Sequence, residues 1–306
     1  MGFYNVENLF DTIDDPRKND NAFLPDSKKA WNTYRYFEKI DRLAEVIERM
    51  NEWGNLIFIG FCEVENHAVL QDLSWSSRIS KSKYSIIHRS SPDSRGIDVA
   101  AFYDARRFEL LDTLFIRVSD HDDENFKTRD IVYVKGVIEA DTLNIFLNHW
   151  PSRYGGQERS EPKRIVAAEV LRHAVDSLKS LNPKSKILVM GDFNDYPFNK
   201  SIRNHLLAVH PDSLNQEQEL INLAYPLSTE GVGTYFYKGE WGMLDQVMVS
   251  RALYPQTKGG EMHIFNPDFI THERRDGEKV PSRSYLGNKY AGGYSDHFPI
   301  FIELKK

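Results

Sequence analysis

Several polar residues that can bind a metal or move a proton stand at the ends of apolar runs. They are Glu63 after residues 56–61, Asn148 and His149 after 143–147, Asp192 and Asn194 after 187–190, Asp245 within 244–249, and Asp296 and His297 before 298–304. Carboxylate oxygens, without Cys and His at zinc spacing, select a hard cation such as Mg²⁺ or Mn²⁺. Two histidines beside such a cation suit general acid and base catalysis of phosphate ester hydrolysis.

Each of these motifs also has a purely structural explanation. Glu63 is suited to cap the following segment, and Asp192 with Asn194 fits a turn. Asp296 and His297 could form a local pair before a strand. Five unrelated turns would have no reason to carry the same combination of carboxylates, amides and histidines. We therefore expect the strand ends to converge on one pocket, where functional residues usually gather.

Short apolar runs rich in β-branched and aromatic residues predict the strands that would position these motifs. The runs are Phe3–Val6, Leu56–Phe61, Tyr84–Ile87, Ile97–Tyr103, Ile131–Ile138, Leu143–Leu147, Ile187–Met190, Leu244–Val249 and Phe298–Leu304. Two amphipathic helices are predicted between them. One has an apolar stripe over residues 40–50, and the other begins near Pro162 and ends near Asn182. Both helices are expected to cover a sheet.

The composition restricts the class of protein. With 306 residues, 41% of them apolar, and a net charge of −6, the chain is a folded globular protein without a broad basic face for nucleic acid. A small basic cleft is compatible with this charge. No run approaches the ~20 apolar residues of a membrane span, and the only cysteine, Cys62, cannot form an internal disulfide. No repeat or linker marks a boundary, so we expect one domain over residues 1–306.

The N-terminal residues show neither the basic region nor the apolar core of a signal peptide. Phe3–Val6 nevertheless has the character of the middle of a strand. We therefore expect that upstream residues, with an export signal among the options, precede it in the natural protein. The compartment is left unassigned.

The motifs occur in an order that resembles the endonuclease/exonuclease/phosphatase superfamily, which includes pancreatic-type deoxyribonucleases, apurinic endonucleases, sphingomyelinases and inositol polyphosphate phosphatases. They are Tyr4-Asn5-Val6-Glu7-Asn8, Cys62-Glu63-Val64, Asn148-His149, Gly191-Asp192-Phe193-Asn194, Leu244-Asp245 and Ser295-Asp296-His297. The N-terminal segment is most similar to bacterial members. The resemblance implies an α/β fold, a four-layer α/β/β/α sandwich in which two mostly antiparallel sheets pack face to face with helices outside.

The resemblance also implies a metal site and a paired histidine. The metal ligands would be Asn5, Glu7, Glu63 and Asp296. His297 would orient or deprotonate the attacking water, and Asp245 would hold its imidazole. A carboxylate beside a histidine fixes the tautomer and stabilises the imidazolium. The cation would be Mg²⁺, with Mn²⁺ or Ca²⁺ as alternatives.

Three further residues receive roles from the same resemblance. Asp192 and Asn194 would position the nucleophile and a phosphoryl oxygen, and His149 would donate to a non-bridging oxygen or to the leaving group. The reaction would be in-line attack of water on phosphorus, in which the protein contributes positioning and electrostatic stabilisation.

The residues themselves suggest four more contributors: Arg95, Asp98, Arg153 and Trp241. Both arginines lie near glycines, where a flexible loop can present a guanidinium to phosphate. The alternative for each is an exposed loop arginine without that role. Asp98 is a candidate partner of His149, and Trp241 belongs to a candidate substrate groove. The segment 242–246 lacks the Arg before and the Tyr after Asp245 that many family members carry, which bears on substrate recognition.

We therefore predict a divalent-metal-dependent phosphodiesterase, an endonuclease or exonuclease that acts on DNA or RNA as a monomer. Aromatic and basic residues flank the motifs and could line a groove. They are Trp150, Arg153, Tyr154, Trp241, Arg274, Arg275, Arg283, Tyr285, Lys289, Tyr290 and Tyr294. A small-molecule or lipid head-group phosphate ester is the alternative substrate and suits the acidic net charge. Ordinary packing is the alternative role of the aromatic residues.

Other classes of protein fit the sequence less well. A thiol hydrolase would use Cys62 with His149 or His297, but the neighbouring Glu63 raises the pKa of a thiol and so disfavours the thiolate. No Gly-x-Ser-x-Gly segment of a serine hydrolase occurs. A catalytically silent binding module is disfavoured because every expected catalytic position holds a competent residue.

Overall fold

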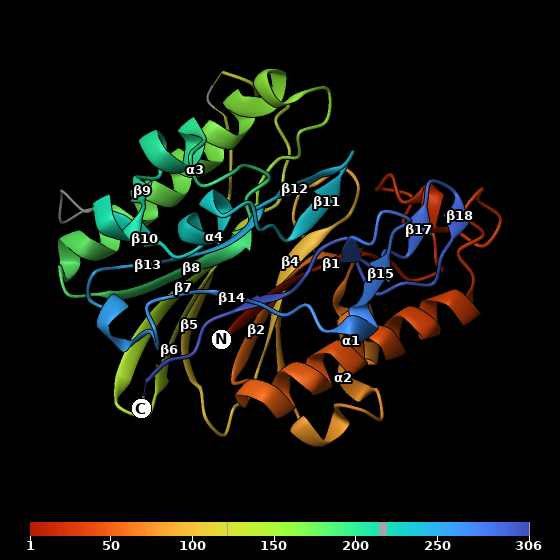
Figure 1. Ribbon diagram of the computed structural model, residues 1–306, viewed down its shortest axis with the longest axis horizontal. Helices are drawn as coiled ribbons and strands as arrows, with labels where there is room; N and C mark the ends of the chain where they lie inside the picture. The colour runs from red at the N-terminus through yellow and green to blue at the C-terminus, as the bar shows by residue number, and fades with distance from the viewer. Residues whose placement is uncertain (121, 214–218, 306) are drawn as a thin grey trace.

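The computed structural model describes residues 1–120, 122–213 and 219–305, which form two large β-sheets with helices outside them (Figure 1). The first sheet has the order β14 (His263–Ile264), β19 (Ile300–Phe301), β1 (Gly2–Leu9), β2 (Phe58–Val64), β4 (Asp98–Tyr103) and β3 (Ser85–His88). The second has the order β5 (Glu109–Ile116), β6 (Ile131–Ile138), β7 (Asp141–His149), β8 (Lys186–Asp192), β13 (Asp245–Val249), β10 (Leu220–Asn222) and β9 (Ala208–Val209).

Most neighbouring strands are antiparallel, which confirms the expected pair of mostly antiparallel sheets. The exceptions include the central pairs β1–β2 and β7–β8, which are parallel. Because parallel neighbours end at the same edge of a sheet, each sheet brings two strand ends together.

The helices of the described residues are α1 (Thr33–Gly54), α2 (His67–Trp75), α3 (Gln157–Leu181) and the short α4 (Tyr225–Thr229). In Figure 1, α1 and α2 lie outside the first sheet and α3 lies outside the second. The side chain of Asn32 caps α1 by accepting from the N–H of Arg35, and Asn55 ends it in a left-handed conformation with φ of 53°. Helix α2 was not predicted from the sequence.

Helix α3 begins five residues before the predicted start at Pro162. Its first turn is held by a buried arginine, since Arg164 donates to the hydroxyl of Ser160 at 2.8 Å and to the carbonyl of Gln157 at 3.0 Å. These hydrogen bonds stabilise the first turn of α3. The apolar pattern of the sequence gives no sign of them, so it predicted a later start. Pro162 is therefore the sixth residue of α3 and lies inside the helix, where its missing N–H removes one intrahelical hydrogen bond.

Three separate layers of apolar side chains hold the sandwich together. Between α1, α2 and the first sheet lie residues such as Leu43, Ile47 and Phe61. Between the two sheets lie residues such as Phe3, Leu147 and Val247. Between the second sheet and α3 lie residues such as Ala168, Leu171 and Val189. Strands of both sheets are therefore buried on both faces, and this confirms the predicted four-layer α/β/β/α order.

Bulges interrupt the two central strands of the first sheet where its acidic residues stand. The pairing of β1 with β2 shifts between Asn5 and Leu9, and the pairing of β2 with β4 shifts between Cys62 and Val64. Glu7 and Glu63 have φ of 49° and 64°, a left-handed backbone that is rare outside glycine. Such bulges turn a side chain away from the regular alternation. They aim both carboxylates at the rim between the sheets.

The other strands form hairpins beyond the sheets. They are β11 (Tyr235–Tyr237) with β12 (Glu240–Gly242), β15 (Thr271–Glu273) with β16 (Lys279–Pro281), and β17 (Tyr285–Leu286) with β18 (Lys289–Tyr290). Short 3-10 turns occur at Asn21–Phe23, Ser80–Ser82, Pro211–Ser213, Tyr254–Gln256 and Asp268–Ile270, and a π-turn at Ser201–His205.

The strand predictions differ from the structure at β5 and at the last run, and they did not include the short strands β9–β12 and β14–β18. Strand β5 was not predicted, because none of its residues is buried and its apolar pattern is therefore weak. The run Phe298–Leu304 pairs as a strand only at Ile300–Phe301.

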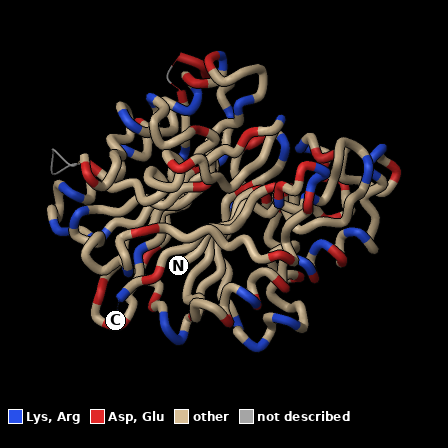
Figure 2. The backbone as a smooth tube through the Cα atoms, viewed as in Figure 1, with Lys and Arg blue, Asp and Glu red and all other residues tan. Residues whose placement is uncertain are grey.

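Charged residues lie mainly on the outer elements. Figure 2 shows Lys and Arg interspersed with Asp and Glu over the helices and loops, while the strands between them carry few charges. The described chain therefore shows no broad face of one sign in this view. None of its helices combines the length and the apolar character needed to cross a membrane.

Candidate active site

Three neighbouring strands of the second sheet align three candidate site residues side by side across the sheet. His149 ends β7 and is the register partner of Asp192, which ends β8. Asp192 is in turn the register partner of Asp245, which begins β13. From the first sheet, the amide of Asn5 donates to Oδ2 of Asp192 at 3.0 Å. The predicted convergence of strand ends is thus present, and it spans both sheets.

His297 is held between two carboxylates. Its Nδ1 lies 2.6 Å from Oδ2 of Asp245, and its Nε2 lies 3.9 Å from Oδ2 of Asp192. The hydroxyl of Thr234 donates to the same Asp245 oxygen at 2.6 Å and fixes its orientation. Burial by itself lowers the pKa of His297, but the charges of Asp245, Asp192 and Asp296 outweigh it and raise the pKa to about 10. The imidazole is therefore charged at neutral pH.

Asp192 occupies the centre of the site. Besides Asn5, the backbone N–H of Asn194 donates to it at 2.9 Å. Burial raises the pKa of Asp192 to about 6, because the raising effect of burial and of Asp245 exceeds the lowering effect of His297. A carboxylate with a pKa near neutrality can accept a proton from water without being too weak a base.

His149 approaches the same aspartate from the other side but has no carboxylate at its second nitrogen. Its Nε2 lies 3.8 Å from Oδ2 of Asp192 and 3.9 Å from Oε1 of Glu63. Its buried Nδ1 has no hydrogen-bond partner among the described residues. Burial, reinforced by the charges of Arg129, Arg95 and His297, lowers the pKa of His149 well below its usual value. The ring is therefore neutral and can donate one hydrogen bond.

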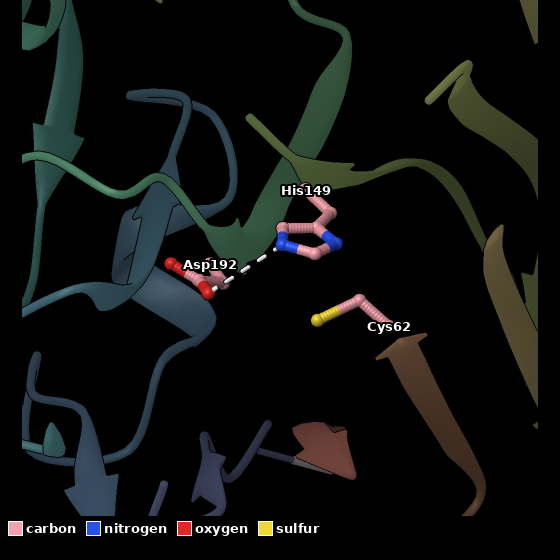
Figure 3. A group of neighbouring side chains, drawn as sticks. All are labelled: Cys62, His149 and Asp192. Carbon is pink, nitrogen blue, oxygen red and sulfur yellow. Dashed lines mark ion pairs between the residues drawn. The ribbon is translucent and has the colours of Figure 1, made fainter. Parts of the chain in front are cut away.

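Cys62 lies beside this histidine, as Figure 3 shows. Cys62, His149 and Asp192 each offer one ligand atom within 4.8 Å of the others. Burial first, and then the charge of Asp192, raise the pKa of the Cys62 thiol well above its usual value. Since only the thiolate is nucleophilic, the geometry disfavours a thiol hydrolase.

Glu7, Glu63 and Asp296 form an acidic cluster in which the charge of Asp296 acts on Glu7 and that of Glu63 acts on Asp296; among the described residues, they are not one of the groups whose ligand atoms all lie within 4.8 Å of one another. Burial and the charge of Asp296 raise the pKa of Glu7, and burial raises that of Asp296, with Glu63 adding to the effect. This mutual repulsion is what a bound cation offsets. Mg²⁺ keeps several waters and takes only one or two carboxylates together with substrate oxygens, so the donor set fits without a closed protein cage.

A second set of potential ligands lies next to this cluster. Asp192, Asp245 and His297 also offer ligand atoms within 4.8 Å of one another. Glu63 is oriented by the N–H of Asn8, which donates to Oε2 at 2.9 Å, and Glu7 by the N–H of Ser284 at 2.6 Å. The site therefore combines five carboxylates, those of Glu7, Glu63, Asp192, Asp245 and Asp296, with two histidines.

The sequence profile of the endonuclease/exonuclease/phosphatase family matches residues 1–306. The chain belongs to this family. Members of this family are phosphoesterase hydrolases that use divalent metals. The protein is therefore an enzyme of this class. A search of curated protein sequences finds no significant match.

Solved structures share the fold over most of the chain. A mannosyl-6-phosphatase of Bacteroides thetaiotaomicron is 15% identical with a TM-score of 0.61, covering 100% of this chain and 98% of that one. D. rerio TDP2, in a complex with a single-strand DNA product, is 12% identical with a TM-score of 0.57, covering 88% and 93%. The catalytic domain of human nocturnin is 16% identical with a TM-score of 0.52, covering 86% and 87%. At these identities the likeness concerns the fold alone.

The predicted partnership of Asp98 with His149 is wrong. Oδ2 of Asp98 lies 2.9 Å from Nε2 of His88, and its other oxygen accepts from the N–H of Ser91 at 2.8 Å. The cause is local: β3 and β4 are antiparallel neighbours, and this brings His88 close to Asp98. Asp98 thus supports the first sheet next to the site, and its carboxylate is already engaged.

Arg153 is also engaged by the protein, so its predicted role as a phosphate clamp is corrected. Its Nε donates to the carbonyl of Asn194 at 2.7 Å, and its Nη2 donates to Asp195 at 3.3 Å and to Asn199 at 3.2 Å. The guanidinium also lies over the ring of Tyr196, 4.0 Å from its centroid. Arg153 therefore holds the turn that carries Asn194.

Arg95 lies close enough to His149 for its charge to act on that ring, and Trp241 has a packing role. The exposed Arg95 contributes to the lowered pKa of His149, and its guanidinium forms no hydrogen bond with any of the described residues. The indole of Trp241 donates to Glu278 at 2.7 Å and stacks on Phe298 at 5.9 Å. Trp241 thus braces a hairpin.

Asn5, a predicted metal ligand, is also held by the protein. Its amide oxygen accepts from the N–H of Glu7 at 3.0 Å, so Asn5 also orients its neighbours.

Sequence reasoning missed two buried cations. Arg129 donates to the carbonyls of His149 and Trp150 at 3.2 and 2.6 Å and pairs with Asp93. Nothing in its sequence neighbourhood distinguishes it. Lys39 is 1% exposed and donates to Ser284 and to the carbonyl of Tyr294. Lys39 directly precedes the apolar stripe of α1 and shares its face with Leu43, four residues later. A charged residue on a buried face needs polar partners, so the sequence did indicate a buried cation here.

Proposed function

We propose that the protein is a divalent-metal-dependent phosphodiesterase that hydrolyses nucleic acid by in-line attack of a water molecule activated by Asp192 and His297. One observation carries the proposal: Oδ2 of Asp192 lies 3.9 Å from Nε2 of His297, and a second carboxylate, Asp245, holds the Nδ1 of the same ring at 2.6 Å. Such a pair can take a proton from water and stabilise the charge that develops.

The residues divide the reaction between them. Asp192, held by Asn5 and Asn194, accepts the proton of the attacking water at Oδ2. The Nε2–H of His297 faces the same region and stabilises negative charge there. The neutral His149 donates from Nε2 to a non-bridging oxygen of the phosphate. Glu7, Glu63 and Asp296 would hold the cation, which when bound neutralises phosphoryl and leaving-group oxygens.

The decisive variant is Glu63→Gln, which keeps the shape of the side chain and removes its charge. We expect the kcat for bis(p-nitrophenyl) phosphate with Mg²⁺ to fall on the order of 10³-fold while the circular dichroism spectrum is unchanged. A matched control is Glu65→Gln, two residues further along. Oε2 of Glu65 accepts from the N–H of Asp11 at 2.6 Å, and burial raises the pKa of this carboxyl to about 8, so its role is local and the control should keep its activity.

The substrate is tested in the same experiment. Plasmid DNA, RNA, a nitrophenyl diester, a nitrophenyl monoester and sphingomyelin are compared with Mg²⁺, Mn²⁺, Ca²⁺ or chelator. We expect diesters to be cleaved faster than monoesters and chelator to abolish every activity. Full activity in chelator, or near-normal activity of Glu63→Gln, would sink the mechanism. Preference for the monoester would assign the enzyme to the small-molecule phosphatases instead.

A further inference from the structure

A cavity of about 470 Å³ opens next to Asp296, on the side away from the second sheet. Residues of three hairpins line it; in Figure 1, β15, β17 and β18 lie towards one end of the molecule, and β11 and β12 lie nearer its middle. Its lining residues are Phe236, Tyr237, Lys238, His272, Arg274, Val280, Pro281, Ser282, Arg283, Leu286, Ala291 and Asp296. This volume lies within the range of about 300–1,000 Å³ for small-ligand sites.

The hairpin β11–β12 presents two of these residues on a stiff turn. Tyr237 pairs with Glu240, so the loop between them has two residues. Both loop residues, Lys238 and Gly239, have positive φ of 51° and 92°. Two positive φ values in a two-residue loop are typical of a tight hairpin turn whose twist matches that of its strands. The positions of Tyr237 and Lys238 at the rim are therefore well defined by the backbone.

A series of aromatic rings connects the catalytic histidine to this rim. The ring of Tyr235 lies 4.7 Å from that of His297, and the ring of Tyr237 lies 6.1 Å from that of Tyr235 at an interplanar angle of 19°. Alternate residues of a strand share one face, which is why the two tyrosines align. Tyr237 is 54% exposed, so the last ring of the series has surface left for a ligand.

Cations line the cavity around these rings. Arg283 lies 3.7 Å from Asp296 at the inner end, and Arg274 lies over the ring of Phe236, 4.7 Å from its centroid. Arg274 also pairs with Asp276, but both side chains are substantially exposed, and such surface pairs are weak and exchangeable. Lys238 lies 5.3 Å from the ring centroid of Tyr237 and forms no ion pair with any other described residue. An anion can therefore enter the rim without displacing a buried partner.

The lining suits a nucleotide better than a sugar. Sugar hydroxyls require several carboxylate or amide partners, whereas the twelve described lining residues include one carboxylate, Asp296, and no amide. Aromatic rings interleaved with Arg and Lys are the surface on which proteins bind single-stranded nucleic acid, since every base can stack and every phosphate can pair. A base within a duplex is already stacked and paired, so it is not free to enter such a cavity.

We propose that this cavity binds the nucleotide adjacent to the scissile phosphate of a single-stranded nucleic acid, with its base against Tyr237 and its own phosphate held by Arg274 and Lys238. The inference rests on the proposed function and adds the substrate class to it: single strands, bound one nucleotide beyond the cleaved bond. Arg283 stands at the junction between the cavity and the catalytic centre.

The test compares two substrates in each variant. The first is a single-stranded oligonucleotide and the second is bis(p-nitrophenyl) phosphate, which has no neighbouring nucleotide. We expect Tyr237→Ala and Arg274→Ala each to lower the ratio of kcat/KM for the oligonucleotide to kcat/KM for the small diester about tenfold. The matched controls are Tyr34→Ala, an exposed tyrosine of α1, and Arg49→Ala, an exposed arginine paired with Glu52, and neither should change the ratio.

A binding measurement in chelator provides a second readout. With 2-aminopurine next to a phosphorothioate linkage, stacking on Tyr237 should quench its fluorescence in the wild type and not in Tyr237→Ala. An unchanged ratio in Tyr237→Ala, or cleavage of the duplex as fast as the single strand, would overturn the inference while leaving the hydrolase intact. Failure of the wild type to cleave the small diester with Mg²⁺ would instead overturn the proposed function.

Discussion

The two histidines of the site lie almost equally far from the same oxygen of Asp192, yet they carry different charges. Nε2 of His297 is 3.9 Å away and Nε2 of His149 is 3.8 Å away. The difference lies at the other nitrogen. Asp245 approaches Nδ1 of His297 at 2.6 Å, whereas Nδ1 of His149 is buried without a described partner. The rings thus differ in whether a carboxylate stands at Nδ1, which favours a charged imidazole at His297 and a neutral one at His149.

The surroundings reinforce this division. Three carboxylates raise the pKa of His297 to about 10 against the opposing effect of burial. Around His149, burial and the positive charges of Arg129 and Arg95 all act in one direction and lower its pKa. The proposed mechanism uses one histidine to stabilise charge and the other to donate a directed hydrogen bond, and these unlike environments suit the two residues to those two roles. Variants of the two histidines, of Asp245 and of Asp98 test this difference between the two rings.

The largest effect is expected for His297→Ala. It removes the cation that faces the attacking water, so the kcat for bis(p-nitrophenyl) phosphate should fall by about 10³–10⁴-fold with Mg²⁺ present. The control is His205→Ala, which breaks a comparable pair with Glu169 at the surface and should keep full activity. A loss of less than tenfold in His297→Ala, with a normal circular dichroism spectrum, would show that this imidazole is not part of the chemistry.

A smaller loss, about 10²–10³-fold, is expected for Asp245→Asn, since the ring remains but loses the carboxylate that holds its charge. The pKa of His297, followed by NMR, should fall from about 10. Because the folded-state pKa is raised, the pair stabilises the fold fully below pH ~6.5 and this contribution is lost as the pH rises towards 10. In chelator, the variant should therefore lose more unfolding free energy at pH 6 than at pH 10. Equal losses at both pH values would contradict the assignment.

His149→Gln should cost about 10²-fold in kcat, because the amide retains a donor but displaces it. The more direct test is the charge of the ring. Long-range ¹⁵N spectra should show a neutral imidazole with its proton on Nε2 from pH 6 to pH 9, since the pKa is lowered well below its usual value. An imidazolium at pH 7 would remove the contrast between the two histidines.

The strand ends were predictable, but the partners of their side chains were not. Glu63, His149, Asp192, Asp245 and His297 each lie within two residues of an apolar run, and burial fixes where such runs end. Partner choice depends on which strands become neighbours and where they bulge. This is why the sequence could not show that Arg153 binds the Asn194 turn or that Trp241 packs on Phe298. Lys39 is the exception, because a charged residue on the apolar face of a helix indicates in the sequence itself that it has buried polar partners.

The smallest loss of kcat is expected for Asp98→Asn, which tests whether His149, like His297, uses a carboxylate partner. Its carboxylate pairs with His88 and does not reach His149, so kcat should change less than about threefold, in contrast to Asp245→Asn. Replacing a buried, hydrogen-bonded carboxylate by an amide of the same shape should cost about 1 kcal/mol of unfolding free energy, measured in urea. A hundredfold loss of kcat at unchanged stability would mean that Asp98 turns to His149 during the reaction, and both histidines would then use a carboxylate partner.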